Sequence, residues 1–206
     1  MKTKMLLIRH GESLANAVGI YLGHTDWDLS EKGKAQAEVV AEYLANTKID
    51  RIFSSDLIRA YNTAAPHARR HGLDIEKRAG LREIYLGEWE GRPVSELEEK
   101  YPEEFGIGWR QRFGTCRVPG GESVQDVANR ICRELENIAK ECPGKTVIVA
   151  THAAAIRATW AAITGTAPED VADTLPFPRN ASITTILYDD GVFVPIEYGF
   201  DGYFDK

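Results

Sequence analysis

The chain has 206 residues, of which 43% are hydrophobic and 27% charged, so it can bury a sizeable core and is most economically one domain spanning 1–206. Its formal net charge of −6 argues against general nucleic-acid binding, which depends on a basic surface. Any affinity for phosphate must therefore come from a local cluster of cations, which favours a small ligand in a pocket. The cysteines are odd in number and lack C-x-x-C spacing, which indicates reduced thiols in a cytoplasmic protein: Cys116, Cys132 and Cys142.

The chain begins with a short apolar run over residues 5–8, which predicts a buried strand. This run is too short for a signal-peptide core, and no later segment approaches the ~20 apolar residues of a membrane span, so we expect no membrane association. Arg9, His10 and Gly11 follow the run. Because neighbouring side chains of a strand point to opposite faces, Arg9 and His10 can converge only where the strand has ended. Gly11 tolerates the conformations that such a break needs.

A long polar loop over residues 11–29 separates this strand from the first predicted helix. Ser30 caps that helix, and its apolar residues recur at i, i+3, i+4 and i+7. Residues 51–54 then read as a second short strand.

The helix after this second strand carries a candidate phosphate ligand. Ser55 or Asp56 is its expected cap, and Arg59 falls in its first turn. Helix N-termini attract anions, and arginine offers a bidentate fork to phosphate. A weak strand is expected over residues 74–77.

The middle of the chain lacks a clean hydrophobic period. Residues 81–91 are predicted to be irregular, and residues 92–120 to form a small inserted lid. Ser123 and Asp126 then match a capping box at the start of a long helix.

A strand predicted over residues 146–151 ends in His152 and so repeats the pattern of the first strand. A helix over residues 153–164 follows. It carries Arg157, which we interpret as a solvated helix residue.

Residues 182–188 and 192–196 are predicted to form a terminal hairpin around an Asp-Asp-Gly turn. Strand–helix alternation followed by a hairpin predicts an α/β fold: a three-layer α/β/α sandwich with a mixed, mostly parallel sheet, helices on both faces and the small lid. Parallel strands deliver their carboxyl ends to one edge, where open α/β sheets bind ligands. We therefore expect His10, Arg59 and His152 to lie within reach of one phosphate group.

Phosphoryl chemistry also needs a group that protonates the leaving oxygen. Several loop carboxylates qualify, and their spacing does not choose among them: Glu12, Asp26, Asp28, Glu83, Glu88 and Glu90.

A series of motifs covers nearly the whole chain. It runs, in order, through Leu7-Ile8-Arg9-His10-Gly11-Glu12-Ser13, Gly23-His24-Thr25-Asp26, Ser54-Ser55-Asp56-Leu57-Ile58-Arg59-Ala60, Leu81-Arg82-Glu83-Ile84, Gly87-Glu88-Trp89-Glu90-Gly91, Pro119-Gly120-Gly121-Glu122-Ser123, Ala150-Thr151-His152 and Asn180-Ala181-Ser182-Ile183. Together these motifs resemble the histidine phosphatase superfamily in its phosphoglycerate mutase-like branch, including the broad-specificity and α-ribazole phosphatases.

The resemblance implies a role for each matching residue. His10 would be the nucleophile, and Glu83 would protonate the leaving oxygen and then accept a proton from the attacking water. The phosphoryl group would be bound by the remaining residues of the site: Arg9, Asn16, Arg59, His152 and Ala153.

The implied activity is that of a metal-independent phosphomonoesterase without a cofactor, which hydrolyses a small phosphorylated metabolite through a phosphohistidine. A mutase is the enzymatic alternative, but mutases of this family carry longer lids and tails than residues 92–120 and 197–206. A scaffold that only binds a phosphorylated ligand is the non-enzymatic alternative, which the intact catalytic set disfavours. Neither the physiological substrate, the phosphatase branch nor the oligomeric state can be read from the sequence.

Two features leave the shape of the pocket open. Ala153, Ala154 and Ala155 stand where the family commonly has glycine, and activity is expected to persist if they adopt helical angles. Basic residues of the lid alternate with glutamates, so we interpret them as solvated rather than as ligands of a second acidic group: Arg92, Lys100, Arg110, Arg112 and Arg117.

Overall fold

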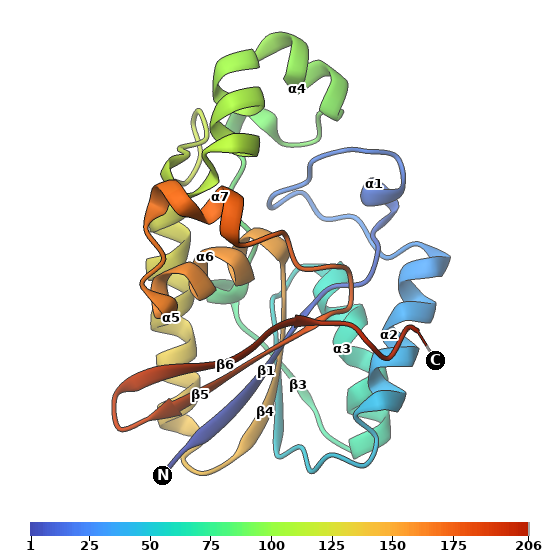
Figure 1. The fold of residues 1–206 in the computed structure, drawn as a ribbon. Coiled ribbons are helices and arrows are strands. Elements are labelled where there is room, and N and C mark those ends of the chain that lie inside the picture. The colour runs from blue at the N-terminus through green and yellow to red at the C-terminus, as the bar shows by residue number, and fades with distance from the viewer. Residues whose placement is uncertain (206) are drawn as a thin grey trace.

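A six-stranded mixed sheet forms the centre of the computed structural model, which describes residues 1–205 (Figure 1). The strand order is β3-β2-β4-β1-β5-β6. The first four of these pair in parallel, and β5 and β6 complete the sheet as an antiparallel hairpin. The strands are β1 (Thr3–Arg9), β2 (Arg51–Ser54), β3 (Ile75–Lys77), β4 (Thr146–Thr151), β5 (Ile183–Asp189) and β6 (Val192–Phe200).

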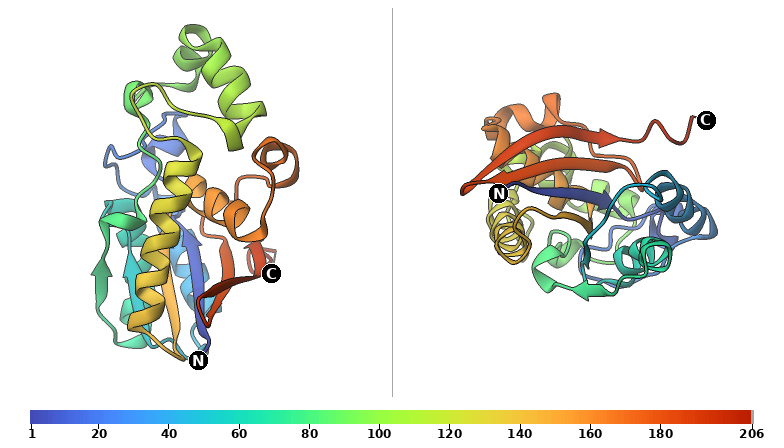
Figure 2. Two further views of the ribbon diagram at one scale, coloured as in Figure 1. Left: turned by 90° about the vertical axis from the view of Figure 1, so that its left-hand side faces the viewer. Right: turned by 90° about the horizontal axis from the view of Figure 1, so that it is seen from below.

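Helices cover both faces of the sheet, as the view along the strands shows (Figure 2). One face is covered by α2 (Glu31–Tyr43) and α3 (Ile58–His71), and the other by α5 (Val124–Glu141) and α6 (Ala153–Thr164). The predicted three-layer α/β/α sandwich with a mostly parallel sheet is therefore confirmed.

Alternation along β1 explains the two hydrophobic layers. Leu6 and Ile8 pack with residues of α2 and α3, whereas Met5 and Leu7 pack with residues of α5 and α6. Because side chains of a strand alternate between faces, a strand that is apolar on both sides must lie in the interior of a covered sheet. Among residues 1–205, no helix is long and apolar enough to cross a membrane.

The segments beyond the carboxyl edge of the sheet are short and irregular. They comprise α1 (Leu14–Ala17), α4 (Val94–Lys100), a π-helix (Pro102–Trp109), α7 (Val171–Thr174) and 3-10 turns at Ala79–Leu81, Gly87–Trp89, Phe113–Thr115 and Pro168–Asp170. The predicted lid contains α4 and the π-helix and lies at the top of Figure 1. Trp89, Phe105, Trp109 and Phe113 join it to the core cluster on the α5–α6 side of the sheet.

Two helix caps follow the sequence prediction and one does not. The Ser30 hydroxyl accepts a hydrogen bond from Gly33 N, and Ser123 and Asp126 form the predicted capping box. For α3, the cap position is Leu57, which offers no side-chain acceptor. The prediction of Ser55 or Asp56 was wrong because Asp26, in the loop before α2, supplies the acceptor instead: its Oδ1 lies 2.8 Å from Ile58 N.

The structure also gives Gly11 a different role from the expected one. Gly11 is absent from the glycines with positive φ among residues 1–205, so it needs no unusual backbone conformation. A Cβ atom there would instead lie 2.4 Å from the carbonyl oxygen of Gly33. Gly11 therefore permits close backbone packing against the start of α2.

Candidate active site

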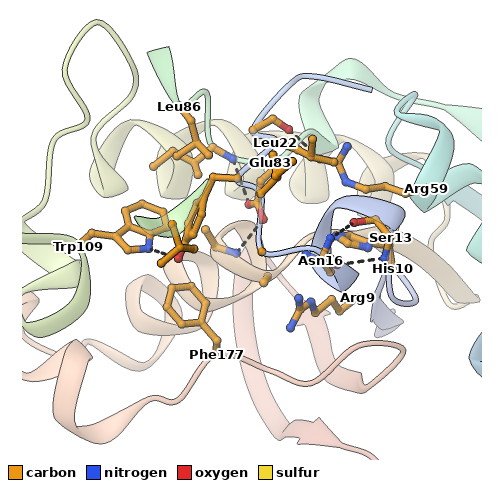
Figure 3. A pocket seen from close by; sticks show the side chains of 18 residues that line it. Arg9, His10, Ser13, Asn16, Leu22, Arg59, Glu83, Leu86, Trp109 and Phe177 are labelled. Atoms are coloured by element: carbon orange, nitrogen blue, oxygen red, sulfur yellow. Dashed lines mark hydrogen bonds between the residues drawn. The ribbon is translucent and has the colours of Figure 1, made fainter. Parts of the chain in front are cut away.

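A cavity of about 280 Å³ opens at the carboxyl edge of the sheet. Figure 3 shows that its two ends differ: Arg9, His10 and Arg59 lie on one side, and Leu86, Trp109 and Phe177 on the other. We call these the inner end and the outer end of the pocket.

The register of the sheet places His152, which is fully buried and does not itself line the pocket, beside His10 of the inner end. Arg9 of β1 lies beside Thr151 of β4, so the residues that follow both strands are neighbours. His10 N donates to Thr151 O at 2.9 Å. The imidazole rings of His10 and His152 meet edge to face, with centroids 5.2 Å apart. Parallel pairing of two strands that are each followed by a histidine thus produces the predicted juxtaposition.

His10 has a defined tautomer. Its Nδ1 lies 2.7 Å from the carbonyl oxygen of Gly11, and a carbonyl can only accept, so Nδ1 carries the proton. In the neutral ring, Nε2 then has a free lone pair. Burial, with the nearby charges of Arg59 and Arg9, holds the pKa of His10 well below its usual range, so the imidazole is neutral at pH 7.

His152 is fully buried at the N-cap position of α6. Neither of its ring nitrogens has a hydrogen-bond partner within residues 1–205. Burial, followed by the charge of Arg59, holds its pKa well below the usual range. A buried imidazole without partners carries a desolvation cost.

Arg9 and Arg59 bring positive charge to the inner end. Arg9 donates to the carbonyl oxygen of Pro178 at 2.6 Å, and Arg59 donates to those of Gly23 and Thr25 at 2.7 and 3.0 Å. The salt bridges within residues 1–205 do not include either arginine. Two guanidinium groups that are oriented by carbonyls and not neutralised by a carboxylate form a site for an anion.

Glu83 is the only carboxylate among the residues that line the described pocket. Its Oε1 accepts from Ala155 N at 3.0 Å and Ile84 N at 3.1 Å, and its Oε2 accepts from Ala154 N at 3.2 Å. The backbone of the first turn of α6 thus holds the carboxylate in place. In Figure 3, Glu83 lies between the inner and outer ends.

The other candidate carboxylates do not line the pocket. Glu12 bonds to Ser30 and Lys32, and Glu90 accepts from His24 N and Thr25 Oγ1. Asp26 accepts a hydrogen bond from Ile58 N, Asp28 accepts one from the side chain of Asn62, and Glu88 accepts one from the hydroxyl of Tyr101. Among the six candidate carboxylates that spacing along the chain left open, only Glu83 lines the described pocket.

Asn16 and Ala153 also line the pocket. The side-chain oxygen of Asn16 accepts from Ser13 N and from Asn180 Nδ2, which fixes the orientation of its amide. Ala153 is the first residue of α6. Alanine replaces the glycine that is common in the family without strain, because the three alanines adopt the helical conformation.

The contacts of two arginines outside the pocket were not predicted from the sequence. Arg157 was interpreted as solvated, but it is only 3% exposed; its guanidinium lies over the rings of Phe113 and Phe177 and donates to Val171 O. Arg130 donates to the carbonyl oxygens of Gly80, Arg82 and Glu83. Arg130 also forms an ion pair with Glu122. Glu122 belongs to the Pro-Gly-Gly-Glu-Ser motif, and this motif was the only sequence signal near the contacts of Arg130.

Comparisons with known proteins agree with this geometry. The family model described as "Histidine phosphatase superfamily (branch 1)" matches residues 5–200. Phosphoserine phosphatase 1 of Hydrogenobacter thermophilus is 41% identical over 79% of this chain and 76% of its own length. A 2,3-bisphosphoglycerate-dependent phosphoglycerate mutase of Gloeothece citriformis is 33% identical over 82% of this chain and 88% of its own. The solved structure of Bacillus stearothermophilus YhfR superposes with a TM-score of 0.91 at 29% identity, and the match covers 98% of both chains.

Proposed function

Because the chain belongs to the histidine phosphatase superfamily (branch 1), we propose that it works through a phosphohistidine formed on His10. The chain is a phosphoric monoester hydrolase that acts on a small phosphorylated metabolite. The observation that carries the proposal is the position of Glu83, the pocket carboxylate, between the cationic inner end and the apolar outer end. An ester whose phosphate occupies the inner end has its bridging oxygen beside that carboxyl group.

In the first step, Nε2 of His10 attacks phosphorus and the bond from phosphorus to the bridging oxygen breaks. Glu83 transfers a proton to that oxygen, so that the alcohol leaves neutral. The substrate can deliver this proton, because the second pKa of a phosphomonoester is about 6. Arg9, Arg59 and His152 stabilise the charge on the transferring phosphoryl group.

In the second step, a water molecule attacks the phosphohistidine and Glu83 accepts the proton that the water loses. The bond between phosphorus and Nε2 breaks, and its electron pair returns to the imidazole of His10. Inorganic phosphate leaves, and the neutral histidine is restored. Asn16 and Ala153 complete the proposed phosphate site.

We also propose that the reaction needs no metal ion. In metal-dependent phosphoryl transfer, cations bridge the phosphate oxygens and neutralise developing charge. Arg9 and Arg59 supply that charge at the inner end. The same proposal places the enzyme in the cytoplasm, which the free thiols of Cys116, Cys132 and Cys142 support.

A mutase is the second candidate, because one relative at 33% identity bears that name. A mutase returns the phosphoryl group to an alcohol, whereas a phosphatase gives it to water. Incubation with a phosphomonoester labelled in its phosphate, with glycerate phosphates present as acceptors, separates the two. We expect inorganic phosphate to carry the label, at a rate that EDTA does not change. Label accumulating on the acceptor would establish the mutase, and inhibition by EDTA would contradict the metal-free mechanism.

A further inference from the structure

The outer end of the pocket is lined by apolar and aromatic side chains: Ile20, Tyr21, Leu86, Val94, Trp109 and Phe177. The rings of Trp109 and Phe177 stack with centroids 6.1 Å apart. Trp109 Nε1 donates to the hydroxyl of Tyr21 at 3.2 Å, which leaves the phenolic proton of Tyr21 as a neutral donor. Among the residues that line the described pocket, the only arginines are Arg9 and Arg59 of the inner end, and no lysine is present.

Arg157 stabilises this wall without presenting its charge to the pocket. Its guanidinium lies 4.3 Å from the ring centroid of Phe177 and 4.4 Å from that of Phe113. The same guanidinium donates to the carbonyl oxygens of Val171 and Ala172, and Arg157 is not among the pocket-lining residues. The cation is therefore used to fix an aromatic surface.

Three arginines of the lid form ion pairs with carboxylates that do not line the pocket. Arg92 pairs with Glu96, and Arg110 pairs with Glu98 at 2.6 Å. Arg117 pairs with Asp126 at 2.8 Å. These arginines, like Lys100 and Arg112, do not line the pocket. A second negative charge on a substrate would therefore find no basic side chain in the lining of the outer end, and only the neutral hydroxyl of Tyr21 as a donor.

We propose that the substrates are monoesters of uncharged, largely apolar alcohols, with at most a neutral polar group facing Tyr21. This inference rests on the proposed function, because it assigns the phosphate to the inner end and the alcohol to the outer end. A carboxylate on the alcohol would have to be buried against aromatic rings without a counter-ion, which is strongly unfavourable. The substrate class therefore differs from the phosphoserine named for the relative at 41% identity, since phosphoserine carries both a carboxylate and an ammonium group.

Benzyl phosphate and 4-carboxybenzyl phosphate form a matched test pair. Both release a benzylic alcohol, and they differ by one charge on the far side of the ring. We expect kcat/KM of the wild-type enzyme to be at least about tenfold lower for the carboxylated ester, because its charge is desolvated without a partner. Equal or higher kcat/KM for the carboxylated ester would overturn the proposal.

A variant of the outer end sharpens the test. Val94→Lys adds a cation to the lining, and Val94→Met adds a side chain of similar reach without charge. We expect Val94→Lys to reduce or reverse the preference and Val94→Met to keep it. If Val94→Met shifted the preference as much as Val94→Lys, the charge argument would be wrong. Failure of the wild-type enzyme to hydrolyse either ester would instead count against the proposed function.

Discussion

The two ends of the pocket are built by different parts of the fold. The inner end rests on β1 and β4, whose parallel register places His10 beside His152. The outer end is assembled from loops and the lid, with Tyr21, Trp109 and Phe177 brought together from distant parts of the chain. Strand ends are fixed by the hydrogen bonds of the sheet, whereas loop surfaces can vary without disturbing it. The comparison teaches that, under the proposed mechanism, the chemistry depends on the sheet edge and the choice of alcohol depends on the loops and the lid.

Removal of the proposed nucleophile should have the largest effect. We expect His10→Ala to reduce kcat below about one hundredth of the wild-type value, since even acid–base assistance alone contributes about 10²–10⁴-fold. His67→Gln is the matched control, because His67 is also a fully buried imidazole but lies in α3 outside the pocket lining. Steady-state rates of both variants decide the matter, and comparable losses would show that His10 acts only through stability.

Glu83→Gln should separate substrates by their leaving group. We expect a loss of about 10²-fold for an alkyl phosphate, whose alkoxide needs a proton, and a much smaller loss in the phosphorylation step for an activated aryl phosphate. Slow hydrolysis of the phosphohistidine would then appear as a burst with the aryl substrate. Stopped-flow kinetics measure both phases.

Glu90→Gln is the control for this variant. Glu90 accepts hydrogen bonds from His24 N, Thr25 Oγ1 and Leu86 N, but Glu90 itself does not line the pocket. Its replacement should slow both substrates by the same factor. A leaving-group dependence in Glu90→Gln would contradict the assignment of Glu83. A Glu83→Gln variant that shows neither a leaving-group dependence nor a burst would contradict it as well.

Arg157→Met tests the outer end alone. The loss of its cation–π contacts and of its hydrogen bonds should lower the free energy of unfolding by about 2 kcal/mol. KM for benzyl phosphate should rise about three- to tenfold as Phe177 loses its support, which corresponds to roughly 1 kcal/mol of binding. Urea unfolding and steady-state kinetics measure the two effects. A fall in kcat for both alkyl and aryl substrates with KM unchanged would show that Arg157 supports the inner end instead.

Mild acid should destabilise the molecule through its buried histidines. Burial lowers the pKa of His67 to about 3 from 6.5, so below pH 6.5 the unfolded chain binds a proton that the folded chain does not. Between pH 7.5 and 5.5, this one group should lower the free energy of unfolding by about 1.4 kcal/mol. His10 and His152 at the inner end act in the same direction.

The measurement is urea unfolding at both pH values for the wild type, His67→Leu and His152→Leu. Each variant should lose part of the pH dependence, whereas Arg157→Met at the outer end should keep all of it. An unchanged pH dependence in both histidine variants would show that these imidazoles have the same pKa in the folded and the unfolded chain.

The inner end was largely predictable because it follows local rules. Apolar runs that end in histidine marked β1 and β4, and parallel strands place their carboxyl ends together. Caps such as Ser30 and Ser123 depend on residues three positions apart, so they too could be read from the sequence.

The outer end and several supporting contacts were not predictable, because they depend on contacts between distant segments. The burial of Arg157 was missed because an arginine in a helix is usually solvated, whereas here Phe113 and Phe177 cover it. The acceptor at the start of α3 is Asp26, which lies 32 residues before Ile58 in the chain. Glu83 stood out from the other carboxylates only when the first turn of α6 was placed beside it.

The most direct test of the central claim is to trap the covalent intermediate. The wild-type enzyme, mixed rapidly with an aryl phosphate and quenched in alkali to preserve phosphohistidine, should carry one phosphoryl group, and peptide mass spectrometry should locate it on His10. Glu83→Gln should accumulate more of this species, and His10→Ala none. A phosphoryl group on His152, or turnover without any phosphoenzyme in either the wild type or Glu83→Gln, would contradict the mechanism.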